Sequence, residues 1–85
     1  MTRTVQLDMD FTDKNVDYWL KGEVTLEIDD LTLNEVEVSE LWKYRENDNT
    51  LEYQVELESL DEDTRNALYD KMAESAITIL GEEGI

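Results

Sequence analysis

The chain has 85 residues and a mass of 10.0 kDa, which is the size of one domain, so we expect a single acidic domain over residues 1–85. It has 23 acidic and 7 basic residues, a formal charge of −16, and no His, Cys or Pro. Without Cys there is no disulfide framework, no thiolate nucleophile and no Cys-based metal site. Without His there is no Ser-His or Cys-His catalytic unit. The composition therefore predicts a protein that is not an enzyme and holds no cofactor or metal ion.

The negative charge is spread evenly along the chain. Residues 1–30, 31–60 and 61–85 each carry a net charge of −5 or −6. An acidic tail would form a block of about five or six like charges, and no such block stands apart, so the charge belongs to the folded body. The hydrophobic fraction is 40%, with two Trp, four Tyr and one Phe, which is enough for a small core. The acidity is therefore not a sign of disorder.

The first two expected elements are strands with a two-residue period. Apolar and polar residues alternate over 4–11, which predicts a strand with one buried face. After a polar turn at 13–15, apolar residues occupy the even positions of a second expected strand, near 16–29. Gly22 interrupts this apolar set, so we expect a bend or bulge there.

A third strand is expected near 35–45, but its phase is ambiguous. If the even positions continue to face in, Trp42 and Glu40 lie inside, and Leu41 joins the polar face. If the phase shifts, Leu41 lies inside instead. A bulge near Ser39-Glu40 would resolve the conflict. Trp42 and Tyr44 are expected to pack in the core or along an edge of the sheet.

The remaining elements are a fourth strand near 50–58 and a helix near 61–80. A turn rich in Asn and Asp, at 46–49, precedes the strand. Apolar residues then recur at helical spacing, with Ser59 or Asp61 as the cap and Gly81 at the end. Four alternate residues of the fourth strand are expected to face the core: Leu51, Tyr53, Val55 and Leu57. The predicted fold class is α+β, a four-stranded antiparallel sheet connected as a meander, with one C-terminal helix packed on one face.

Alternation also places carboxylates in rows on the face opposite the apolar one. Alternate residues of a strand lie about 6.8 Å apart, so the charges recur at regular spacing. Such rows on a twisted sheet can imitate a nucleic-acid backbone, whose phosphates recur along a helical path. Trp19 is expected among them, either as an interface anchor or packed on its cross-strand neighbours. The other candidate partner-binding residues are Asp8, Asp10, Asp17, Glu23, Glu27, Asp29, Glu37, Glu52, Glu56 and Glu58.

A face of this kind can also serve solubility alone. A charge of −16 is far above the magnitude of about 2–8 found for small soluble domains, and its self-repulsion destabilises the fold, which favours a function. These properties are similar to those of phage-encoded DNA-mimic inhibitors of restriction, CRISPR or DNA-repair enzymes. The resemblance implies an inhibitor of the anti-restriction or anti-CRISPR type that occupies the basic nucleic-acid-binding groove of a host protein.

Two other functions fit the same composition. The protein could be a small structural or assembly adaptor that binds a partner through Trp19 or a sheet edge, or a halophile protein that is acidic for reasons of solvation. In the favoured interpretation the partner is a basic nucleic-acid-binding protein, and the chain, a monomer or homodimer, binds neither nucleic acid nor membrane. No apolar run reaches the length of a signal peptide or membrane span, so we expect a cytoplasmic location, in the host cytoplasm if the protein is phage-encoded.

Overall fold

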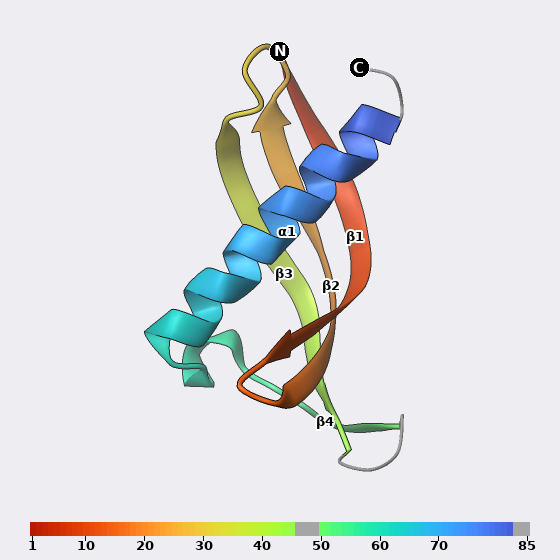
Figure 1. Cartoon of the computed structure of the whole chain (residues 1–85), viewed down its shortest axis with the longest axis vertical. Helices are drawn as coiled ribbons and strands as arrows, with labels where there is room; N and C mark the ends of the chain where they lie inside the picture. Colours follow the sequence, from red (N-terminus) through yellow and green to blue (C-terminus); the bar gives the residue numbers. More distant parts are fainter. Residues whose placement is uncertain (46–49, 83–85) are drawn as a thin grey trace.

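The computed structural model describes residues 1–45 and 50–82, apart from the side chain of Glu52, so the turn expected at 46–49 lies outside the described residues. The four strands form one antiparallel sheet in the order β1-β2-β3-β4, and α1 crosses one face of it diagonally (Figure 1). The predicted α+β meander is therefore confirmed. The elements are β1 (Thr2–Asp13), β2 (Val16–Glu27), β3 (Leu33–Tyr44), β4 (Leu51–Gln54), a short 3₁₀ helix η1 (Leu57–Ser59) and α1 (Glu62–Glu82).

The core lies between α1 and the inner face of β1, β2 and β3. Every fourth residue of α1 from Thr64 to Leu80 is buried, because that spacing keeps one stripe of the helix against the sheet. The buried apolar residues are Val5, Leu7, Phe11, Tyr18, Leu20, Val24, Leu26, Leu41, Leu68, Met72, Ala76 and Leu80. No helix in the described part of the chain has the length and apolar character needed to cross a membrane.

The bulge expected in the third strand is confirmed. Lys21 pairs with Glu40 but the next residue, Gly22, pairs with Val38, so Ser39 is the extra residue of β3. The bulge reverses the phase of the strand, and Leu41 is 2% exposed in the core. Trp42 and Tyr44 consequently lie on the face away from α1. Of the two placements expected for them, in the core or along an edge of the sheet, the first is therefore wrong.

The fourth strand is much shorter than predicted. β4 ends at Gln54, and the chain leaves the sheet after Val55, whose N–H donates to the carbonyl oxygen of Leu41 at 2.7 Å. Leu51 and Tyr53 are 41% and 50% exposed, so the prediction that they are buried in the core is wrong. Tyr53 pairs with Lys43, which pairs with Tyr18, so Tyr53 does point to the inner side of the sheet. Alternation produces a buried face only where another layer covers it, and α1 packs on β1, β2 and β3.

The helix boundaries also differ from the prediction at one end. Asp61 is the N-cap, since its Oδ1 accepts the N–H of Thr64 at 2.7 Å. Gly81 does not end the helix, because α1 runs to Glu82. A glycine stops a helix where it takes the left-handed conformation, and Gly81 does not take it.

Candidate functional site

The candidate site is the outer face, by which we mean the side chains of β1, β2 and β3 that point away from α1. Strand register brings them together, since Asp10 pairs with Trp19 and Trp19 in turn pairs with Trp42. Glu23 likewise lies opposite Glu37. The charged side chains of the outer face are Lys21 and eight carboxylates: Asp8, Asp10, Asp17, Glu23, Glu27, Glu35, Glu37 and Glu40.

Four of these carboxylates accept hydrogen bonds from neutral side chains on another strand. The donors are an amide, an indole, a hydroxyl and a phenol, none of which carries charge. The bond from the phenol runs from β3 to β1 and so passes over β2. The four bonds are Gln6 Nε2 to Glu23 Oε2 (2.6 Å), Trp19 Nε1 to Asp8 Oδ1 (2.5 Å), Thr12 Oγ1 to Asp17 Oδ1 (2.6 Å) and Tyr44 OH to Asp10 Oδ1 (2.8 Å).

Neutral donors hold a carboxylate in place without cancelling its charge. Within residues 1–45 and 50–82, the one cation in ion-pair contact with an outer-face carboxylate is the amino group of Met1, 2.6 Å from Glu27 Oε1. Lys14 instead pairs with Asp61 at the start of α1. On the outer face, the sheet and its cross-strand hydrogen bonds therefore set the positions of four of the eight negative charges, those of Asp8, Asp10, Asp17 and Glu23.

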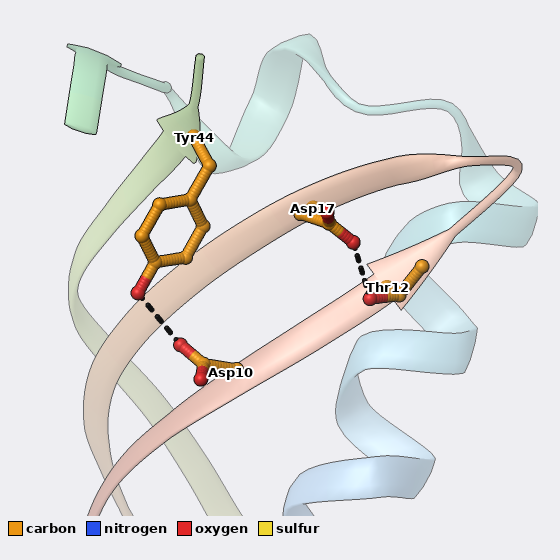
Figure 2. A pocket seen from close by; sticks show the side chains of 4 residues that line it. All are labelled: Asp10, Thr12, Asp17 and Tyr44. Atoms are coloured by element: carbon orange, nitrogen blue, oxygen red, sulfur yellow. Dashed lines mark hydrogen bonds between the residues drawn. The ribbon is translucent and has the colours of Figure 1, made fainter. Parts of the chain in front are cut away.

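One end of the outer face is hollowed. Asp10, Thr12, Asp17 and Tyr44 line an open depression of about 450 Å³. Figure 2 shows the Tyr44 ring extending from β3 toward Asp10 on β1, while Thr12 and Asp17 face each other on the β1–β2 hairpin. The pKa of Tyr44 is raised, chiefly because its OH donates to Asp10, and the charges of Asp10, Asp8 and Asp17 add to the effect. The depression is therefore lined by two carboxylates, those of Asp10 and Asp17, and by one aromatic ring.

The structure brings most of the residues predicted from sequence together on this face and leaves others away from it. Asp29 lies in the turn after β2, Glu56 precedes η1 and Glu58 lies within η1, so these three do not continue the strand rows. Glu52 lies on β4, and its side chain is outside the described part. The residues on the outer face are Asp8, Asp10, Asp17, Trp19, Glu23, Glu27 and Glu37.

Sequence reasoning missed Glu35 and Glu40, and it missed the role of Tyr44. Glu40 turns outward because of the bulge at Ser39, and this could be found from sequence only by placing the bulge first. Trp19 is half-buried, and its indole N–H is used on Asp8, so it packs on its cross-strand neighbours as well as facing the acidic surface.

The outer face offers no metal centre. In the described ranges, no group of three or more acidic side chains has an arrangement that could hold a metal ion. When the chain is compared with protein-family models, curated proteins and solved structures, it has no match. The function must therefore be argued from the chemistry of the face itself.

Proposed function

We propose that the protein is a nucleic-acid mimic, an inhibitor of the anti-restriction or anti-CRISPR type whose outer face occupies the basic groove of a host nucleic-acid-binding protein. The observation that supports this most is the holding of outer-face carboxylates by neutral donors from other strands. A face that serves only solubility needs hydrated charges and has no need for charges in defined positions. A mimic needs both the charge and its position.

Fixed carboxylates suit binding to a basic groove for two physical reasons. Side chains already held by hydrogen bonds lose less conformational freedom when the partner binds, which improves affinity. A face with a single exposed lysine, Lys21, among eight carboxylates also attracts a cationic partner over long range and accelerates association at low salt.

The depression beside Tyr44 suits an arginine of the partner. A guanidinium group is planar, stacks on an aromatic ring and donates to carboxylates with a fixed geometry. Tyr44 supplies a ring, and Asp10 and Asp17 supply carboxylates in the same depression. In this proposal the protein itself binds neither nucleic acid nor membrane, performs no catalysis and acts in the cytoplasm of the host cell.

The test is competition with DNA for purified nucleic-acid-binding proteins, including restriction endonucleases and CRISPR effector complexes. The anisotropy of a labelled duplex reports its displacement as the acidic protein is added. The outer-face variant replaces five acids of β1 and β2 by their amides, namely Asp8, Asp10, Asp17, Glu23 and Glu27. The matched control makes the same change in charge on α1, at Glu62, Asp63, Asp70, Glu74 and Glu82.

We expect the unaltered protein to displace DNA from at least one of these enzymes. The outer-face variant should lose at least about ten-fold in apparent affinity, whereas the helix variant should keep most of it. Equal losses in the two variants would show that net charge alone matters and would contradict the proposal. So would a failure of the unaltered protein to displace DNA from any member of the panel at low salt.

A further inference from the structure

We infer that the open edge of β3 is a second binding surface, which takes an extended strand of a partner protein with alternating basic and apolar residues. The open edge is the side of residues 33–40 that faces away from β2. β4 pairs only with Trp42–Tyr44, and Val55 adds one bond to Leu41. Among the described residues, no strand pairs with the rest of that side, and Figure 1 shows the upper part of β3 at the margin of the sheet.

An unpaired edge of this length is a template for strand addition. Its backbone N–H and C=O groups can pair with any extended chain, and proteins normally protect such edges by shortening, bulging or covering them. Two register shifts lie within the open edge, one at Ser39 and one at Asn34, and they leave residues 35–38 as regular strand between them. The edge is therefore available for pairing over several residues.

The inner side of this edge is apolar and incompletely covered. Leu33, Val36 and Val38 point to the same side as the buried residues of β2, yet Leu33 is 44% exposed and the two valines are only half-buried. A strand added at β3 would cover this surface with its own inward side chains. The edge of β1 differs, because the inward residues beside it are already covered by α1.

The outer side of the same edge is acidic. Glu35, Glu37 and Glu40 point outward along it. Glu56 and Glu58 border a groove of about 170 Å³ between residues 38–41 and 54–58. A strand that pairs here would therefore meet carboxylates with its outward side chains and apolar groups with its inward ones, which selects basic–apolar alternation. A second copy of this chain would set the same glutamates against each other, so it is not the expected occupant.

The experiment uses a capped, fluorescent peptide of about eight residues that alternates valine and arginine. Binding is measured by anisotropy at about 0.15 M salt, where charges beyond about 8 Å are screened. Two further peptides have the same sequence but carry N-methyl groups on alternate backbone amides. The first is methylated on one alternate set and the second on the other, so the two peptides have the same charge and the same residues. In a paired strand only one set faces β3.

We expect one methylated peptide to bind at least about ten-fold more weakly than the other, because it loses the hydrogen bonds to the edge. Equal binding of the two peptides would show attraction by charge alone and would overturn the inference, as would the absence of saturable binding. Hydrogen exchange should slow at residues 33–40 in the complex. If those amides were already protected in the protein alone, and the protein self-associated, the edge would be occupied by a second copy of the chain. That result would also overturn the inference.

Two variants locate the site on the protein. Leu33→Ser should weaken binding of the unmethylated peptide several-fold, whereas Leu51→Ser, at a leucine of similar exposure on β4, should not. The double change Glu35→Gln and Glu37→Gln should also weaken binding of the unmethylated peptide, because it removes two carboxylates that face the peptide's arginines. This inference stands apart from nucleic-acid mimicry, since the methylated pair tests backbone pairing at β3 and the DNA competition tests carboxylates of β1 and β2.

Discussion

Gly22 occupies a position where the fold has no room for a side chain. A Cβ there would collide with the backbone carbonyl oxygen of Glu37 and would lie 3.1 Å from the Cε of Met72. Glycine therefore lets β2 pass close to the bulged part of β3 and to α1 together. This is why the interruption of the apolar pattern of β2, at Gly22, lies next to the bulge of β3, at Ser39.

Gly22→Ala should lower the free energy of unfolding by about 1–3 kcal/mol, the usual cost of overpacking. Urea denaturation measures the change. Gly81→Ala is the matched control, because a Cβ at that helical position meets nothing within 4 Å and alanine favours the helix. An unchanged unfolding midpoint for Gly22→Ala would show that the strands can separate without cost.

Leu31 has a backbone conformation that suits glycine better. Its φ of 57° lies in the left-handed region, where the Cβ of an ordinary residue is crowded. Leu31→Gly should raise the free energy of unfolding by about 1 kcal/mol, again measured in urea. Leu31→Ala keeps the Cβ and should show no such gain, so an equal gain in both variants would point to removal of the exposed leucine instead.

At the scale of the element, the start of α1 depends on one carboxylate. Asp61 caps the helix through Thr64 and also accepts a hydrogen bond from Lys14 Nζ at 2.8 Å, which ties the helix to the β1–β2 hairpin. These bonds, that from Lys14 first, hold the pKa of Asp61 well below its usual range. The ionised carboxylate of Asp61 is therefore more stable in the folded state than in the unfolded state.

The pH dependence follows from the lowered pKa. The contribution of ionised Asp61 is fully present above the unfolded-state pKa of about 4 and is lost as the pH falls through that value toward the lower folded one. Asp61→Asn keeps a capping oxygen but loses the charge, so it should be less stable than the unaltered protein at pH 7, and the gap should close below about pH 4. Asp70→Asn, elsewhere on α1, is the control and should show no comparable gap at pH 7.

At the scale of the whole molecule, charge repulsion opposes folding. With a net charge of −16, screening by salt should stabilise the folded state, so the urea midpoint should rise between about 0.05 and 0.5 M NaCl. We expect the protein to be folded already at the lower concentration, as a mimic that works in ordinary cytoplasm requires. A chain that folds only in molar salt would instead indicate adaptation to a saline cytoplasm.

The sequence by itself determined the strands β1 and β2, the helix and the acidic character of the sheet's outer face. Periods of two and of about 3.6 residues are local properties, and they decide which side chains share a face before any long-range contact forms. For this reason Asp8, Asp10, Asp17, Glu23 and Glu27 could be assigned to one surface from alternation alone.

Only the tertiary structure decided the length of β4, the outward turn of Glu40 and the donors that hold the carboxylates. β4 ends at Gln54, outside the part of the sheet on which α1 packs, and Glu40 turns outward because Ser39 is the extra residue of the β3 bulge. The bond from Tyr44 to Asp10 joins residues 34 positions apart across an intervening strand. Each depends on register between distant segments, which local periodicity does not encode.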